Sequence, residues 1–136
     1  MLRKDYILRQ LEEFGKVMAV ILGFKKQNDW TNFENEIKKA TLKFTSLEIN
    51  TVENLNEPDF EKQILNHPNL IQDQKKILAD LLFEKLNFYA EKNEEEKYLS
   101  LKTKCFKLYQ HIQNNHTDNE FDMNVHYKLE ILKKQN

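Results

Sequence analysis

Apolar residues recur along the chain at alternating steps of three and four positions, the spacing of one face of an α-helix. The first such stripe predicts a helix, and it consists of Ile7, Leu11, Phe14, Met18 and Ile21. The block from Val17 to Phe24 is apolar nearly all round, so that half of the helix must be covered on more than one side. Gly15 lowers the stability of a helix by about 1 kcal/mol relative to alanine. This glycine is either simply tolerated or allows a neighbouring helix to approach closely.

A second helix is predicted to begin near Asp29. Asn28 and Asp29 are capping residues, and Thr31 with Glu34 matches a capping box. The stripe of this helix is the most regular in the chain, and it consists of Trp30, Phe33, Ile37, Ala40, Phe44 and Leu47. The short link predicts that the first two helices form an antiparallel hairpin. The periodicity then lapses over residues 48–55, which predicts a connector held to the core by the isolated apolar residues Ile49, Val52 and Leu55.

The middle of the chain predicts a short helix followed by a long one. Asn56 is a suitable cap for the short helix, Pro58 suits its first turn, and Pro68 ends it. The long helix is predicted over about Leu70–Glu91, and apolar residues cover most of its circumference. We therefore expect it to be the central helix of the fold, with Lys75 among its exposed residues.

Two further helices complete the predicted fold. Asn93 is a plausible left-handed residue after the long helix. The next helix follows at once with the stripe Tyr98, Leu101, Cys105, Leu108 and Ile112, and residues 113–118 form a polar loop. A last helix is predicted over about Asn119–Lys134, with the stripe Phe121, Val125, Leu129 and Leu132. No segment alternates with the period of a strand, so we predict an all-α domain over residues 1–136, with about five or six helices in antiparallel hairpins.

Composition narrows the possible classes of protein. The 136 residues include only 2 Gly and 2 Pro, which excludes all-β and collagen-like folds and the glycine-rich motifs that bind phosphates. The 21 basic and 22 acidic residues create no overall field that would favour nucleic acid. The apolar block at residues 17–24 is too short for a membrane span and lacks the cleavage site of a signal peptide. A lone cysteine suits a reducing compartment, so we expect a cytoplasmic protein.

One segment carries a family resemblance. The stretch LNFYAEKNEEEKYLSLKTKCFKL, residues 86–108, resembles the turn between the two helices of a tetratricopeptide repeat (TPR). Asn93 stands where that repeat has a glycine and Cys105 stands at a small position, whereas Tyr98 departs from the second small position. The whole chain, with its opening Asp5-Tyr-Ile-Leu-Arg-Gln-Leu-Glu, is similar to a family of small uncharacterised bacterial helical proteins. The resemblance implies a TPR-like helical array and no particular activity.

Candidate chemistry is sparse in the sequence. His111 and His116 are separated by about 140° on a helix, whereas a zinc-binding pair lies on one face. A composite site with Cys105 and Asp118 is conceivable, but histidines of a surface or loop are the favoured interpretation. Cys105 lies on an inner stripe, where a thiol behaves as a small hydrophobic residue. We therefore predict no catalytic residue, no cofactor, no metal site and no enzymatic activity.

The aromatic content bears on the mode of action of the protein. The 9 Phe and 5 Tyr are more than a helical core usually needs, so some of them fill wide gaps or contact a partner. We predict a cytoplasmic interaction module whose TPR-like helical face binds a protein or peptide, with no nucleic-acid or membrane partner. The candidate interface residues are Phe14, Met18, Ile21, Trp30, Tyr98 and Tyr109. The alternative is an obligate homo-oligomer, for instance a homodimer, that associates through its first helix and binds an unidentified small ligand.

Overall fold

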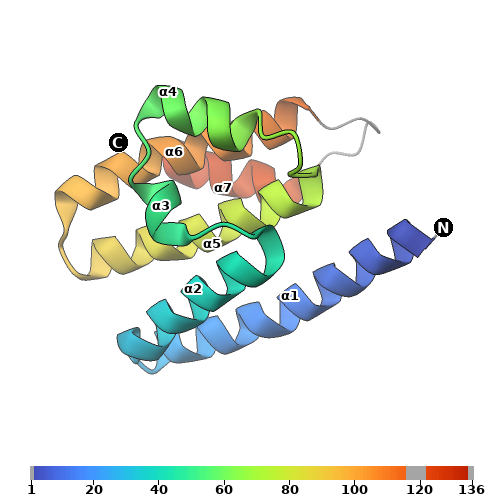
Figure 1. Cartoon of the computed structure of the whole chain (residues 1–136). Coiled ribbons are helices and arrows are strands. Elements are labelled where there is room, and N and C mark those ends of the chain that lie inside the picture. Colours follow the sequence, from blue (N-terminus) through green and yellow to red (C-terminus); the bar gives the residue numbers. More distant parts are fainter. Residues whose placement is uncertain (1, 116–121, 135–136) are drawn as a thin grey trace. The chain divides into compact units, whose positions relative to one another are not determined.

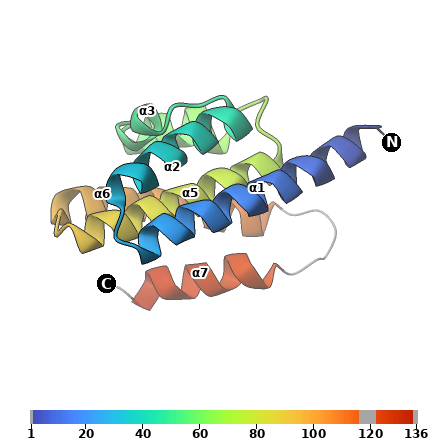
Figure 2. The ribbon, with the colours of Figure 1, turned by 90° about the horizontal axis from the view of Figure 1, so that it is seen from below.

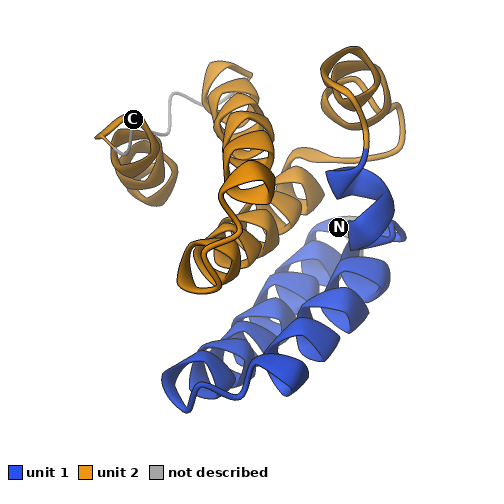
Figure 3. Ribbon diagram, turned by 90° about the vertical axis from the view of Figure 1, so that its left-hand side faces the viewer, with its two compact units in different colours: residues 1–54 blue, residues 55–136 orange. Residues whose placement is uncertain are grey.

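The computed structural model describes residues 2–115 and 122–134, and all regular structure in these ranges is helical. The described residues form seven α-helices and one π-helical segment, η1. The all-α prediction is therefore confirmed, although the helices are more numerous than predicted. Contacts divide the chain into two compact units, residues 1–54 and residues 55–136 (Figure 3). The single domain over residues 1–136 stays a prediction.

The first unit is a helical hairpin followed by a short helix (Figure 1). It contains α1 (Leu2–Lys26), α2 (Trp30–Thr45) and α3 (Ile49–Glu53). The antiparallel pairing of α1 and α2 is confirmed, and Asn28 in the link has a positive φ of 58°. The predicted connector after α2 contains a helix, α3, that was not foreseen. The burial of Ile49 and Val52 is confirmed, and the helical turn brings these two residues to the same side.

Aromatic packing fixes how α1 and α2 align. The rings of Phe14 and Phe44 meet edge to face, with their centroids 5.5 Å apart. Beside them, Lys43 forms an ion pair with Glu13 at 2.9 Å. Because α2 ends at Thr45, these contacts place the end of α2 near the middle of α1. The earlier turns of α1 therefore extend past α2 (Figure 1).

The ends of α2 differ in one respect from the prediction. The N-cap is Asp29, whose Oδ1 atom accepts a hydrogen bond from the backbone N–H of Asn32 at 3.3 Å. The predicted capping box was wrong, because Thr31 lies inside the helix, after Asp29 has already supplied the cap. At the other end, Ser46 adopts the left-handed region with a φ of 63°, and its N–H bonds to the carbonyl of Leu42.

The second unit begins with two short segments and continues with three longer helices. It contains α4 (Glu57–Phe60), η1 (Glu61–Leu65), α5 (Gln72–Glu91), α6 (Glu95–Asn114) and α7 (Met123–Lys134). The predicted cap of the first segment is confirmed, since Asn56 Oδ1 accepts a hydrogen bond from the N–H of Asp59 at 2.8 Å. The predicted short helix corresponds to α4 and η1, and the change from α- to π-helical hydrogen bonding divides it into two.

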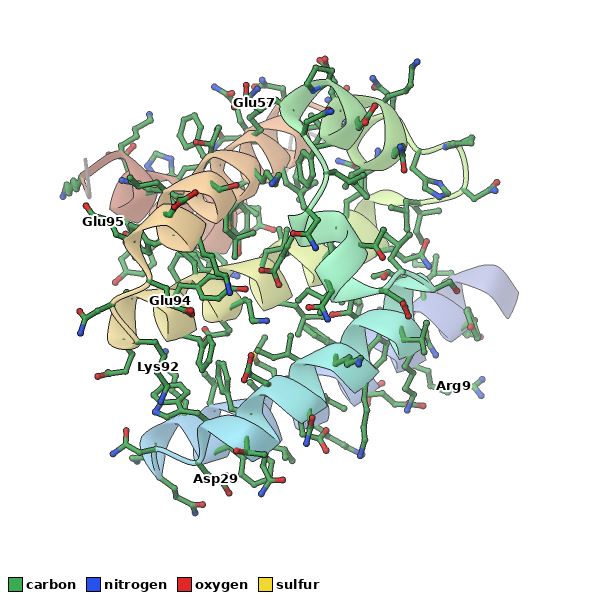
Figure 4. The ribbon with its side chains drawn as sticks, turned by 60° about the vertical axis from the view of Figure 1, so that its left-hand side comes forward. Arg9, Asp29, Glu57, Lys92, Glu94 and Glu95 are labelled. Carbon is green, nitrogen blue, oxygen red and sulfur yellow. The ribbon has the colours of Figure 1, made fainter. Side chains whose placement is uncertain are left out.

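The helix α5 is the most buried helix of this unit. Twelve of its residues, polar ones included, are buried, and α6 returns antiparallel to it (Figure 2). The turn between them places Asn93 at a φ of 58°, which confirms the predicted left-handed position. Figure 4 shows Glu94 and Glu95 at the start of α6, where the helix dipole favours negative charge. The last helix, α7, contacts α6, while the predicted start at Asn119 and the stripe residue Phe121 lie outside the described residues.

Lys75 corrects the prediction for the start of α5. It was expected in solvent, but it is buried, and its ammonium donates a hydrogen bond to the carbonyl oxygen of Leu65 at 2.8 Å. Leu65 is the last residue of η1, where backbone carbonyls have no partner within the segment. Lys75 therefore supplies the missing donor, which periodicity cannot reveal because η1 and α5 are separate segments.

Candidate functional site

One face of α1 is more apolar than a solvated helix surface should be. We define the α1 outer face as Leu8, Leu11, Gly15, Met18 and Leu22. At about 100° per residue, these positions share an arc of about 80°, which also carries the exposed Lys4 and Lys26 near the two ends of the helix. Leu8 and Leu22 are 50% and 41% exposed, Gly15 is exposed, and Leu11 and Met18 are half-buried. The α1 outer face therefore remains partly open to solvent.

The glycines of the chain bear on what this face can contact. Both lie in α1, and a Cβ atom added to Gly15 or Gly23 would meet no atom within 4 Å. Neither residue has a positive φ, so alanine would suit the backbone at both positions. No described residue of this chain therefore makes the close approach suggested at Gly15. The packing of the chain itself does not require a glycine there.

Three of the six predicted interface residues are buried within their own unit. Phe14 and Ile21 are buried in the first unit, where Phe14 packs against α2. Met18 and Trp30 are half-buried, and the Trp30 ring meets Phe33 with centroids 5.1 Å apart. In the second unit, Tyr98 is half-buried, whereas Tyr109 is fully buried. Of the six residues, Met18 alone belongs to the α1 outer face. Whether any of them contacts a partner stays a prediction.

The second unit contains a buried polar cluster that sequence reasoning missed. The Tyr109 hydroxyl donates a hydrogen bond to Asp80 Oδ1 at 2.6 Å, and the Lys128 ammonium donates to the same oxygen at 2.9 Å. The Lys128 ammonium also lies over the rings of Phe83 and Tyr109, at 5.0 and 5.8 Å from their centroids. Cys105 lies nearby, with its thiol 3.8 Å from the carbonyl of Ala79. The cluster joins α5, α6 and α7.

The electrostatics of this cluster favour a structural role over a catalytic one. Burial, and then the charge of Asp80, raise the pKa of Tyr109 well above its usual value. The same two causes raise the pKa of the Cys105 thiol, so that the thiolate needed for nucleophilic attack does not form near neutral pH. Within the described part of the chain, every buried side-chain nitrogen and oxygen has a hydrogen-bond partner. The polar groups of the cluster are thus used in holding the helices together.

A second polar cluster surrounds His111. Its Nε2 atom lies 3.2 Å from the Lys75 ammonium, and its Nδ1 atom lies 3.2 Å from the amide nitrogen of Asn115. Burial, and then the positive charge of Lys75, lower the pKa of His111. Burial also lowers the pKa of Lys75. Both shifts disfavour a second positive charge at this point, so the imidazole is held neutral where α5 meets α6.

Helix α7 carries exposed apolar residues that were not predicted. Met123 and Tyr127 are 69% and 65% exposed and lie four residues apart, on one side of the helix. The predicted stripe of Val125, Leu129 and Leu132 is buried, which confirms the inward face of α7. The spacing of Met123 and Tyr127 in the sequence is a signal for this outer pair, but two residues do not make a periodic pattern.

The geometry assigns no metal site. Among residues 2–115 and 122–134, no three His, Cys, Asp or Glu side chains are placed to share an ion, and His116 and Asp118 lie outside these ranges. No helix of the described residues combines the length and the apolar character that a bilayer crossing requires. Comparison with known proteins assigns no family, because no family model, curated protein or solved structure matches this chain. Its function must be argued from the surfaces and clusters described above.

Proposed function

We propose that the chain is a non-enzymatic protein-interaction module of the cytoplasm, and that the α1 outer face is its contact surface. The observation that carries this proposal is the exposure of Leu8 and Leu22 on one side of a long helix. Full burial of a leucine side chain stabilises by about 1.5–3 kcal/mol. At 50% and 41% exposure, each leucine leaves on the order of 1 kcal/mol for a partner to gain.

The non-enzymatic part of the proposal is supported by the way polar groups are used. Asp80, Tyr109 and Lys128 bond to one another, and Lys75 bonds to the backbone of η1. A catalytic acid, base or nucleophile needs an arrangement in which it can reach a substrate. The buried titratable groups of both clusters are instead saturated by contacts within the chain.

The finer proposal is that the α5–α6 hairpin belongs to a TPR-like array related to small bacterial helical proteins. It is supported by the antiparallel pairing of two helices of equal length around Asn93. The burial of Cys105 at a position where the repeat has a small residue also supports it. Tyr98 departs from the pattern of the repeat, which has a small residue at this position. Its ring is half-buried, and the Lys102 ammonium lies over the ring at 6.0 Å from the centroid.

Affinity capture from a native cytoplasmic extract tests the proposed function. The test variant is Leu8→Asp with Leu22→Asp, which places two charges on the α1 outer face. The matched control is Leu42→Asp with Leu99→Asp, because these leucines are 55% and 54% exposed and lie on α2 and α6. We expect quantitative mass spectrometry to show that associated chains, including further copies of this one, are lost with the test variant and retained with the control. Equal capture by both variants, with unchanged circular dichroism, would contradict the proposal.

A further inference from the structure

We infer that α4 and η1 form an acid-sensitive clasp, residues 57–65, which separates from the α5–α6 hairpin when His111 takes up a proton. The inference concerns the second unit alone and does not depend on the α1 outer face. In the closed clasp, Lys75 of α5 lies between the last carbonyl of η1 and the His111 ring. A proton on His111 turns the second of these contacts from attraction into repulsion.

Two polar contacts among the described residues join the clasp to the hairpin. At the start of α4, Glu57 pairs with Lys107 of α6 at 3.5 Å (Figure 4). These two side chains are 58% and 42% exposed, so the pair adds little to stability. At the end of η1, the buried Lys75 ammonium donates a hydrogen bond to the carbonyl oxygen of Leu65 at 2.8 Å. The contact of Lys75 is therefore the buried polar connection between the clasp and the hairpin.

The π-helical conformation makes the end of η1 depend on this connection. A π-helix is a rare form that is found mostly as single turns, so tertiary contacts must support it. Leu65 is the last residue of η1, where the segment itself offers its carbonyl no donor. Without Lys75, this carbonyl would be buried and unpaired, which is unfavourable. Loss of Lys75 should therefore favour the exposure of η1 to water.

His111 lies on the other side of the Lys75 ammonium. Its Nε2 atom is 3.2 Å from Lys75 Nζ. A neutral imidazole has a lone pair that can accept a hydrogen bond, whereas an imidazolium donates from both nitrogens and is positively charged. Two positive charges at this separation repel each other, and more strongly at a partly buried site than in water. One of the two side chains must therefore move when His111 is protonated.

The helix ends determine which side chain moves. His111 lies in the last turn of α6, where the helix dipole favours a positive charge. Lys75 is the fourth residue of α5 and lies near the opposite end of a helix dipole, where a positive charge is disfavoured. Its ammonium is also carried on a flexible four-carbon stem. We therefore expect the protonated ring to keep its place and Lys75 to leave the Leu65 carbonyl.

No described acidic group offsets the charge that His111 gains. Burial, and then the charge of Lys75, lower the pKa of His111. The amide of Asn115, which is the other polar neighbour of the ring, is uncharged. Two nearby lysines of α5 and α6 are paired with acids, and these pairs are Lys76 with Asp122 and Lys107 with Glu57. The other charged side chains of the clasp are exposed, and they are Asp59, Glu61 and Lys62.

Proton binding sets the direction and the ceiling of the effect. The open clasp returns His111 towards its ordinary pKa of 6.5, whereas the closed clasp holds this pKa lower. The open form therefore binds protons more readily, and the equilibrium shifts towards it as pH falls below 6.5. At about pH 5, roughly 1.5 units below the ordinary pKa, the opening constant can rise by at most about thirtyfold.

Hydrogen–deuterium exchange of the full-length protein, followed by mass spectrometry, tests the clasp. Rates are measured at about pH 7.5 and pH 5 and corrected for the intrinsic pH dependence of exchange. We expect peptides that cover residues 57–67 to exchange at least about threefold faster at the lower pH, and those of α5 and α6 to change by less than about twofold. Exchange that rises equally throughout the second unit, or that does not change in residues 57–67, would overturn the inference.

Three variants assign the response to its groups. His111→Gln cannot titrate and should lose the acid response. The matched control is His67→Gln, because His67 follows η1 directly and binds the N–H of Asn69 through Nδ1 at 3.0 Å. This control should keep the response. Lys75→Met should expose residues 57–67 at both pH values. An acid response of wild-type size in His111→Gln, its loss in His67→Gln, or wild-type protection in Lys75→Met would each refute the clasp.

Discussion

The strongest test of the second unit is the removal of the Lys128 ammonium by Lys128→Met. The ammonium lies 2.9 Å from Asp80 Oδ1, and the two side chains are only 16% and 12% exposed. Methionine keeps most of the apolar stem that lies along Phe83 and Tyr109, so the change removes mainly charge. It leaves the Asp80 carboxylate buried, with the Tyr109 hydroxyl as its remaining donor in the cluster.

The magnitude follows from what is lost and what remains. At an effective dielectric constant of about 20, unit charges 2.9 Å apart attract by about 6 kcal/mol, and desolvation of both ions offsets most of this. The variant loses the attraction but keeps the desolvation of Asp80. Breaking a buried pair in this way costs about 3–5 kcal/mol. Because Tyr109 still donates to Asp80, we expect the free energy of unfolding to fall by about 2–3 kcal/mol.

Urea unfolding followed by far-ultraviolet circular dichroism measures this change. The matched control is Lys133→Met on the same helix, since Lys133 pairs with Glu130 at 3.5 Å and both are well exposed. The control should change the free energy of unfolding by less than about 0.5 kcal/mol. The double variant Asp80→Asn with Lys128→Met should be more stable than Lys128→Met, because it removes the unpaired charge of the cluster and keeps an oxygen that accepts from the Tyr109 hydroxyl. A loss with Lys128→Met as small as with the control would refute the reasoning.

Three further predictions concern single residues. His111 has a pKa lowered by burial and then by Lys75, so the folded state binds fewer protons than the unfolded chain below pH 6.5, the ordinary pKa. The free energy of unfolding should therefore fall as pH drops through this range, and urea titrations should show a smaller fall for His111→Gln; an equal fall would contradict this. Ser46→Gly should raise the free energy of unfolding by about 0.5–1 kcal/mol, because glycine adopts the φ of 63° without strain. A urea titration followed by Trp30 fluorescence that shows no gain in stability would disprove this. Cys105, buried and with a raised pKa, should react with a thiol reagent only on unfolding, so rapid labelling of the native chain would count against its burial.

Periodicity predicted the helices because the apolar residues that recur with the helical period are also the ones that pack into the core. The stripe of α2, from Phe33 through Ile37 to Phe44, is buried as predicted. The cap at Asn56 and the left-handed Asn93 were also predictable, since each follows from the chemistry of one residue and its neighbours in the chain. The helix α3 was missed because five residues are too few to show a period.

The polar clusters were not predictable from the sequence. Asp80 and Tyr109 are 29 residues apart, and Asp80 and Lys128 are 48 apart, so no local pattern relates them. Lys75 shows the same limitation, because its partner is a backbone carbonyl on a separate segment. A charged residue in an apolar stretch indicates that some partner is required, but only the fold determines which one.

The contrast between α1 and α5 shows where functional information lies in a protein of this kind. Both helices are apolar over much of their circumference, and periodicity treats them alike. In α5 the chain covers this surface, for Ile77, Leu81 and Leu86 are all buried. In α1 it does not, because Leu8 and Leu22 remain exposed beside a glycine that no neighbour requires. An apolar residue that the fold covers is explained by stability, whereas one left exposed next to an unneeded glycine calls for a contact outside the chain. The residues that the fold leaves unexplained are therefore the ones at which its function should be sought.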